Sequence, residues 1–244
     1  MTEAERPFVG WDFSHITDTR RMVEAPLTWS YSSNVLRQFS KIHSLLDMDT
    51  GGGEFLALLQ PLPSYTCATE NYGPNVSVAR RRLEPLGVQV FEVSEDNSNL
   101  PFVDNEFELI INRHGSYIPG ELLRILKAGG QFITQQVGGQ SYPGLNALFG
   151  IDEEHQYAHW NLPYAVKELT ESGFEILEQR EDFPITRFFD VGAIVYNLKA
   201  VPWQIPDFAV EKYFDALLKI HSTIQKQNYV DVYAHRFLIV AQKR

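Results

Sequence analysis

The stretch LLDMDTGGGEFL, residues 45–56, does most to predict the fold. An apolar run ends in an acidic residue, three consecutive glycines follow, and the chain then becomes apolar again. A buried strand that leads through a glycine turn into a helix lets the backbone approach a nucleotide closely, with the amino end of the helix facing the ligand. We therefore expect a strand over 42–48 and a helix over 54–62. One residue is irregular, because Asp49 stands where such turns usually carry glycine.

The segments after this turn alternate between strand-like and helix-like patterns. Strands separated by helices of this length predict a parallel sheet covered on both faces, and right-handed crossovers make it a doubly wound α/β sheet. The further strands that we expect in this sheet are 64–70, 88–93, 107–113 and 131–137.

The chain is expected to have four parts. Residues 1–40 form an N-terminal cap that is helical or irregular, and 41–183 form a Rossmann-like core that binds the cofactor. Residues 184–232 are a mainly helical insertion, and 233–244 return as the final strand of the core sheet. Within the insertion, apolar residues recur with helical periodicity over 210–227. An insertion of this kind is a natural lid or substrate-recognition element.

Composition limits the class of protein. The chain has 244 residues, of which 44% are hydrophobic and 13% aromatic, so it can bury a real core. No apolar run approaches the roughly 18 residues that a membrane span needs. The beginning of the chain, MTEAERPFVGWDFSH, is too polar for a signal peptide, and the single cysteine, Cys67, excludes an internal disulfide and a cysteine-rich zinc site. We expect a cytoplasmic protein, monomeric or homodimeric, without a membrane span.

The charge disfavours a nucleic-acid partner. The formal net charge is −10 and the pI is about 5.2, and such a surface repels polyanions. The densest basic stretch is ARRRLEPL at 79–86, but three consecutive arginines spread around a helix and indicate a solvated face.

Acidic and amide residues follow the expected strands at one edge of the sheet. Glu70 ends the second strand, where a carboxylate can accept hydrogen bonds from both ribose hydroxyls. Asp96 and Asn97 follow the third strand and can accept from an adenine amino group, although SEDNSN is also an ordinary turn sequence. Because parallel strands end at the same edge, these groups predict a nucleoside-binding site there.

Five motifs, LLDMDTGGGEF, CATE, EDNSNLPF, FELIINRHGSY and RILKAGGQFI, resemble in order and spacing those of class I S-adenosylmethionine-dependent methyltransferases. The portion LPF, FELI and RILKAGG looks most like the type 11 branch, and the resemblance covers residues 41–137. It implies a mostly parallel, seven-stranded Rossmann-like sheet. A pyrophosphate-binding dehydrogenase is disfavoured because the glycine spacing differs.

By this resemblance, the cofactor is S-adenosylmethionine and the reaction is direct methyl transfer to a small or medium-sized acceptor molecule. The residues from Asp47 to Gly53 hold the methionine end, Glu70 the ribose, and Asp96 and Asn97 the adenine. The residues from Asn112 to His114 border the sulfonium. The full set of implied cofactor contacts is Asp47, Asp49, Thr50, Gly51, Gly52, Gly53, Glu70, Asn71, Asp96, Asn97, Asn112 and Arg113.

Two residues depart from the family pattern. Asp49 replaces the first glycine of the turn, and since aspartate tolerates a positive φ, we expect the turn to form. Its carboxylate either attracts the sulfonium and ammonium or repels the cofactor's carboxylate, and we expect weaker binding. Gly115 stands where related sequences often carry a larger polar residue. A methyltransferase fold that acts as a non-catalytic binding or regulatory protein is therefore an alternative, and an RNA methyltransferase, which needs a basic stripe, is another.

Candidates for the acceptor side are His114 and Tyr117, which could deprotonate or orient a nucleophile. Methyl transfer needs mainly an in-line approach in a desolvated pocket, so a base is not required. Trp11, Trp29, Tyr31 and Trp203 could line the acceptor pocket, and packing explains them equally well. His155 and His159 share a helix face but have no evident third ligand, so we expect no metal.

Overall fold

The computed structural model describes residues 3–6, 8, 13–151 and 157–244. The chain forms two compact units. The larger unit comprises Thr28–Val137, Asn161–Glu181 and Phe237–Arg244, and the smaller unit comprises Met1–Leu27, Gly138–Trp160 and Asp182–Arg236.

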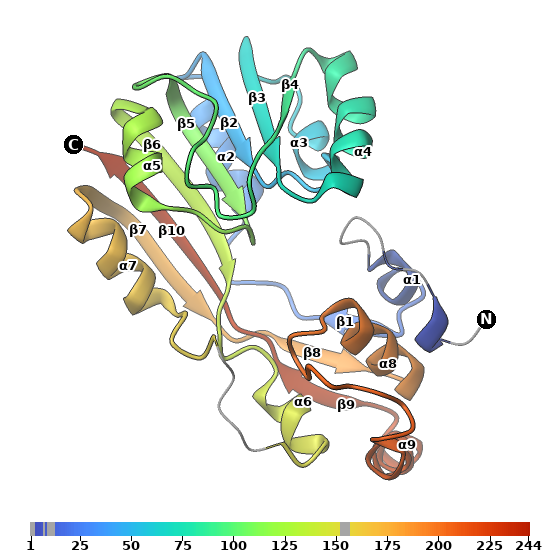
Figure 1. The fold of residues 1–244 in the computed structure, drawn as a ribbon. Coiled ribbons are helices and arrows are strands. Elements are labelled where there is room, and N and C mark those ends of the chain that lie inside the picture. The colour runs from blue at the N-terminus through green and yellow to red at the C-terminus, as the bar shows by residue number, and fades with distance from the viewer. Residues whose placement is uncertain (1–2, 7, 9–12, 152–156) are drawn as a thin grey trace. The chain divides into compact units, whose positions relative to one another are not determined.

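The larger unit is built on a seven-stranded sheet with the order β4-β3-β2-β5-β6-β10-β7 (Figure 1). The strands from β4 to β6 pair in parallel, and the arrow of β10 points opposite to those of β6 and β7. This confirms the mostly parallel Rossmann-like sheet. The strands are β2 (Ser44–Met48), β3 (Tyr65–Glu70), β4 (Gln89–Glu92), β5 (Phe107–Arg113), β6 (Leu126–Val137), β7 (Phe174–Asp182) and β10 (Arg236–Lys243).

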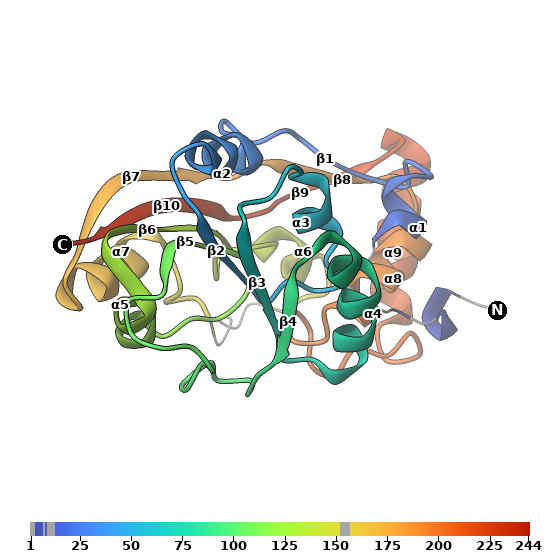
Figure 2. The ribbon, with the colours of Figure 1, turned by 90° about the horizontal axis from the view of Figure 1, so that it is seen from above.

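Helices cover this sheet on both faces, and α2 lies on the opposite side of the strands from α5 and α7 (Figure 2). Every residue of β2 is buried, as expected for a central parallel strand. Alternate residues of each strand point to opposite faces, so Leu45, Leu109 and Ile111 form one core cluster with side chains of α2, α3 and α4. The helices are α2 (Tyr31–Phe39), α3 (Glu54–Leu58), α4 (Gly73–Leu83), α5 (Pro119–Ile125) and α7 (Leu162–Glu171), with the 3-10 turn η2 (Glu84–Leu86).

The glycine turn between β2 and α3 needs its glycines for two reasons. Gly51 and Gly53 have φ values of +64° and +79°, in the left-handed region that glycine adopts without strain. A Cβ on Gly53 would also lie 2.7 Å from Cγ of Leu83, so the glycine permits the close approach of α4. The expected strand, turn and helix are therefore present, with a helix shorter than 54–62.

The smaller unit contains an antiparallel sheet of three strands, β1 (Met22–Glu24), β8 (Ile185–Phe188) and β9 (Val230–Tyr233). The expectation that 184–232 is mainly helical misses β8 and β9, because each is only four residues long and its alternation is too brief to stand out. The other elements are η1 (Glu3–Glu5), α1 (Ser14–Thr17), α6 (Pro143–Leu148), α8 (Val191–Ala200) and α9 (Phe214–Gln227).

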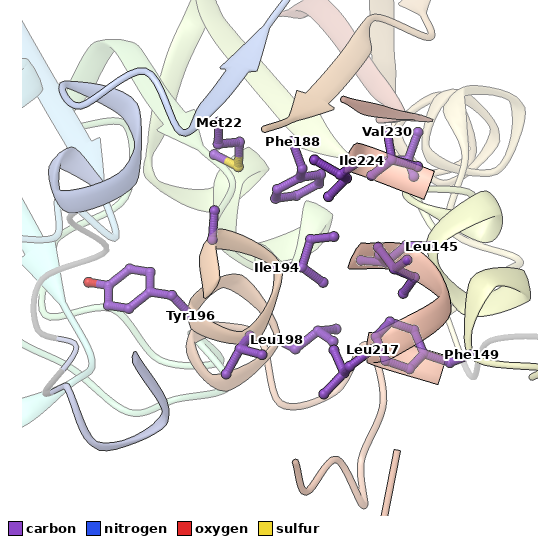
Figure 3. Close-up of a cluster of buried hydrophobic side chains, with 14 of the residues drawn as sticks. Met22, Leu145, Phe149, Phe188, Ile194, Tyr196, Leu198, Leu217, Ile224 and Val230 are labelled. Carbon is purple, nitrogen blue, oxygen red and sulfur yellow. The ribbon is translucent and has the colours of Figure 1, made fainter. Parts of the chain in front are cut away.

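An apolar cluster forms the core of the smaller unit (Figure 3). Phe188 lies opposite Met22 on one side and Val230 on the other. Ile194 of α8 and Leu217 of α9 belong to the same cluster. The unit is thus held together by aliphatic and aromatic packing between its sheet and its helices.

The boundary between the units differs from the expected cap of residues 1–40. Helix α2 belongs to the larger unit, where its Tyr31 and Val35 are buried in the sheet's core. In the portion of the chain that the structure describes, no helix is both long and apolar enough to cross a membrane.

Candidate functional site

The carboxyl ends of four neighbouring strands bring the predicted cofactor residues together. In the sheet order β4-β3-β2-β5, connections leave β2 and β5 in opposite directions, which makes the β2–β5 junction the topological switch point. Asp47 lies opposite Ala68 and Ile111, and Met48 lies opposite Asn112. The loops that carry Asp49, Asn71, Asn97 and Gly115 therefore start from this one edge, where open α/β sheets bind ligands.

Asp47 is buried at the end of β2 and accepts a hydrogen bond from Thr50 Oγ1 at 2.6 Å. Burial, together with the charges of Asp49 and Glu70, raises the pKa of Asp47 to about 7, although the Thr50 hydrogen bond and the charge of Arg113 oppose the shift. Asp47 therefore titrates near neutral pH while it holds the turn.

Asp49 has a φ of +54°, so the turn forms with aspartate in the left-handed region, as expected. Its carboxylate accepts hydrogen bonds from Asn71 Nδ2 at 3.0 Å and from Asn97 Nδ2 at 3.2 Å, and from the backbone amide of Ser116. One side chain thus joins the loops that follow β2, β3, β4 and β5. Burial, followed by the charge of Glu70, raises the pKa of Asp49 to about 7.

Gly115 provides the space that Asp49 occupies. A Cβ on Gly115 would lie 2.3 Å from Asp49 Oδ2 and 2.8 Å from Asn112 Nδ2, distances at which atoms overlap. Asp49 and Gly115 therefore form one structural feature, because the carboxylate at 49 requires the absence of a side chain at 115.

Glu70 is buried at the end of β3 and faces the backbone of its own loop. Its Oε1 accepts from the Tyr72 amide at 2.8 Å, and the amides of Gly51 and Asn71 also donate to the carboxylate. Burial raises its pKa against these hydrogen bonds. The carboxylate predicted to bind the ribose thus also ties the glycine turn to the end of β3.

The two residues of the SEDNSN loop separate in the structure. Asp96 is exposed, and it accepts from Ser94 Oγ at 2.7 Å and from the Ser98 amide at 3.1 Å, which lowers its pKa. Asn97 is fully buried, has a φ of +51°, and donates to Asp49 and to Ser116. Its Oδ1 has no hydrogen-bond partner among the residues described. Asn97 thus belongs to the buried edge, whereas Asp96 forms a solvated turn.

Asn112 lies at the centre of the edge and is fully buried. Its Oδ1 accepts from Gln136 Nε2 at 2.7 Å and from Thr134 Oγ1 at 3.1 Å. Its Nδ2, which faces the space beside Gly115, finds no hydrogen-bond partner in the described ranges. The neighbouring Arg113 is exposed, with its guanidinium 5.2 Å from the centre of the Phe55 ring.

His114 is exposed, has a φ of +67°, and contacts a glutamine that the sequence did not single out. Gln135 Oε1 accepts from Trp29 Nε1 at 2.9 Å, so the amide nitrogen of Gln135 is the atom that donates to His114 Nε2 at 3.2 Å. Nε2 is then the acceptor, and the proton of the neutral imidazole is on Nδ1. This arrangement disfavours Nε2 as a general base.

Tyr117, the second catalytic candidate, packs edge-on against Phe132 with ring centres 5.0 Å apart. Burial and the charge of Glu168 raise the pKa of Tyr117 well above its ordinary value. The phenol therefore stays protonated, which favours packing or hydrogen bonding over base catalysis.

Of the four aromatic substrate candidates, Trp29 and Tyr31 belong to the larger unit. Tyr31 is buried in the core of the larger unit. Its hydroxyl donates to the Asn112 carbonyl at 3.0 Å, so it helps to fix the backbone of the strand that carries Asn112. Trp29 contacts Gln135, and Trp203 belongs to the smaller unit. Trp11 lies outside the described residues.

His155 also lies outside the described residues, so the histidine pair 155 and 159 is not seen as a pair. No group of three or more histidine, cysteine or acidic side chains suited to a metal occurs in the described part of the chain.

The donor set at this edge fits S-adenosylmethionine. Two buried carboxyls, at 47 and 70, and the partly buried carboxyl at 49 suit a cationic cofactor with hydroxyl groups. A Cβ on Gly51 would meet nothing within 4 Å, so the turn is open at that point. The unpartnered Oδ1 of Asn97 and Nδ2 of Asn112 offer an acceptor and a donor. Against this, Asp49 already engages Asn97, and Glu70 already engages backbone amides.

Sequence reasoning missed Thr134, Gln135 and Gln136, whose polar side chains orient Asn112 and His114. The available signal was the polar run TQQ near the end of an apolar strand, QFITQQV, directly beside the strand that carries Asn112. Buried polar side chains of this kind are hydrogen-bonded and often orient a site.

Comparison with known proteins supports the fold. A protein from Bacillus halodurans C-125, provisionally described as a methyltransferase, superposes with a TM-score of 0.57 at 20% identity, covering 86% of this chain and 99% of its own. A functionally unknown protein from Deinococcus radiodurans R1 has a TM-score of 0.62 at 14% identity, covering 95% and 99%. The 4+2 cyclase SpnF has a TM-score of 0.52 at 16% identity, covering 87% and 84%.

No protein-family model matches the sequence, and no curated protein matches it. The structural likenesses show the fold alone: this chain has the Rossmann-like fold of class I methyltransferases.

Proposed function

We propose that the chain binds S-adenosylmethionine at the carboxyl edge of its seven-stranded sheet and transfers the methyl group to a small or medium-sized acceptor. The observation that carries this proposal is a group of polar residues at four adjacent strand ends around the switch point: the buried Asp47, Glu70, Asn97 and Asn112, and the partly buried Asp49. We place the chain in the type 11 branch as part of the same proposal, on the motifs of its sequence.

The bound cofactor supplies an electrophilic methyl group on a sulfonium. The residues of this chain act by binding and desolvation, because displacement at such a carbon needs an in-line approach in a dry pocket. Asp47 and Glu70 keep the glycine turn in shape, and the carboxylates make the edge electronegative. His114, with its proton on Nδ1, serves to orient the acceptor by hydrogen bonding and not as a base at Nε2.

The second candidate is a methyltransferase-fold protein that does not catalyse and instead serves as a binding or regulatory partner. The observation that favours it is Asp49, whose carboxylate fills the space beside Gly115 and already holds the Asn71 and Asn97 amides. The fold alone does not fix the activity, since a protein described as a 4+2 cyclase, SpnF, also has it. The acidic charge of the chain favours neither an RNA substrate nor another polyanion.

Calorimetric titration with S-adenosylmethionine and S-adenosylhomocysteine tests the proposal, with an Asp49→Gly variant alongside. We expect micromolar binding by the unaltered chain. Binding by the glycine variant alone would favour the second candidate, because Asp49 then disables an otherwise intact site. If neither protein binds either compound, the cofactor assignment is wrong. For the RNA alternative, salt-dependent RNA binding is the supporting result.

A further inference from the structure

The carboxyl edge brings three carboxyl groups close together. Asp47, Asp49 and Glu70 influence one another's pKa values, and in the described ranges none of them has a lysine or arginine within the 4.0 Å of an ion pair. The arginine whose charge reaches Asp47 is Arg113, which is exposed and lies over Phe55. The hydrogen-bond partners of the Asp49 side chain are neutral amides, at 71, 97 and 116.

A second, independent feature points to a ligand at this place. Asn112 Nδ2 and Asn97 Oδ1 are fully buried and have no partner in the part of the chain described. Asn112 Nδ2 and Asp49 Oδ2 both face the position of the missing Cβ of Gly115, at 2.8 and 2.3 Å. Buried polar atoms without partners are rare in folded proteins, and a bound polar group explains them directly.

We propose that Asp49 makes this site selective for positive charge, so that it binds the sulfonium cofactor more tightly than the neutral thioether that remains after methyl transfer. This inference rests on the proposed function. A partly buried carboxylate held by neutral amides loses hydration without gaining an opposite charge, and a cationic ligand supplies that charge while a thioether does not. Asp49 is then a specificity-determining residue. Because it stabilises the bound thioether less than the bound sulfonium, it favours release of the demethylated product.

The selectivity has a pH dependence whose sign follows from the surroundings. The groups that face Asp49 are the carboxyls of Asp47 on β2 and Glu70 on β3, and the neutral amides at 71, 97 and 116. Asp49 has a pKa of about 7, so it is ionised above that pH and neutral below it. We therefore expect the preference for the cation to be present above about pH 7 and to weaken as the pH falls through this value.

The test compares dissociation constants of S-adenosylmethionine, sinefungin, which carries an amine in place of the sulfonium, and S-adenosylhomocysteine. Calorimetry at about pH 8.5 and about pH 6 gives the ratio of the thioether constant to the sulfonium constant. The variant is Asp49→Asn, which keeps the shape and tolerates a positive φ. The matched control is Glu92→Gln, which removes an exposed carboxylate on β4 opposite Glu70.

In the unaltered protein at the higher pH, we expect both cations to bind about tenfold more tightly than the thioether. The ratio of the thioether dissociation constant to the sulfonium dissociation constant should approach one in Asp49→Asn, and also in the unaltered protein at the lower pH. In Glu92→Gln at the higher pH this ratio should remain about ten, as in the unaltered protein. Equal binding of all three compounds by the unaltered protein, or a ratio that Asp49→Asn leaves unchanged, overturns the selectivity but not the proposed function. Binding only after Asp49→Gly shows that the residue blocks the site, which also overturns it. Failure of every variant to bind overturns both proposals.

Discussion

The carboxyl edge of the seven-stranded sheet and the apolar cluster of the smaller unit are both buried, but burial has opposite energetic consequences in them. In the cluster, Phe188 and Ile194 are fully buried aliphatic or aromatic side chains, and each square ångström removed from water stabilises the fold by about 25 cal/mol. At the edge, burial of Asp47 and Asp49 disfavours their charged forms and raises both pKa values to about 7.

The backbone of the edge has positive φ values at three residues that are not glycine. Asp49, Asn97 and His114, which follow three different strands, all have φ values between +51° and +67°. Such conformations cost free energy in residues other than glycine and persist where the surroundings enforce them. Positive φ values also occur at Arg20, Tyr142 and Asn228 of the smaller unit, so the ionisable groups with raised pKa values are what mark the edge as a candidate site.

The largest effect is expected in the apolar cluster. Phe188→Ala should lower the free energy of unfolding in urea by about 3–5 kcal/mol, because it removes a fully buried ring between Met22 and Val230. Phe189→Ala is the matched control: its side chain is 40% exposed, and a loss below about 1 kcal/mol is expected. Equal losses in the two variants would contradict the assignment of the cluster as core.

The fit between Asp49 and Gly115 should appear as coupling. Gly115→Ser should cost about 1–3 kcal/mol of stability, since its Cβ would overlap Asp49 Oδ2. In an Asp49→Gly background the same change should cost much less, and thermal unfolding of the four proteins in this cycle measures the difference. Gly120→Ser is the control, because a Cβ there meets nothing within 4 Å. Additive effects at 49 and 115 would contradict the fit.

The partly buried carboxyl at 49 should make stability depend on pH. A folded pKa raised from 3.8 to about 7 means that the folded chain holds a proton that the unfolded chain has lost, so this stabilisation is lost as the pH rises through about 7. Asp49→Asn lacks that dependence, and its free energy of unfolding relative to the unaltered protein should increase by about 2–3 kcal/mol between about pH 5 and pH 8. Denaturation across this range is the measurement, and a difference that stays constant or falls would contradict the raised pKa.

The smallest effect concerns the proton of His114. Nitrogen-15 NMR should show Nε2 unprotonated in the neutral side chain, because Gln135 donates to it. Gln135→Leu should give a mixture of the two neutral tautomers of His114. It should also lower the free energy of unfolding by about 1 kcal/mol, because a hydrogen bond is lost. Gln136→Leu is the control, since Gln136 donates to Asn112 and Gly115 instead. A single Nε2-protonated form in the unaltered protein would contradict the hydrogen-bond pattern.

Much of the fold could be predicted because its signals are local. The five parallel strands are apolar runs that end at acids, glycines or helices, and all five are present in the sheet. Strands β8 and β9 could not be predicted from four residues each, because they are stabilised by pairing with each other and with β1. The candidate site follows the same division: the ends of β2, β3 and β5 were identified, but the supporting residues on β6 were not.

The sequence by itself determined which residues reach the carboxyl edge, because the periodicity of each strand and the order of the elements are properties of neighbouring positions. Only the tertiary structure decided what those residues do there. Asp49 and Gly115 lie far apart in the chain, and their fit depends on β2 and β5 being neighbours. Glu70 faces backbone amides of its own loop and of the glycine turn, and Gln135 joins Trp29 to His114. Such side-chain directions and partners result from packing between distant segments, which no local pattern encodes.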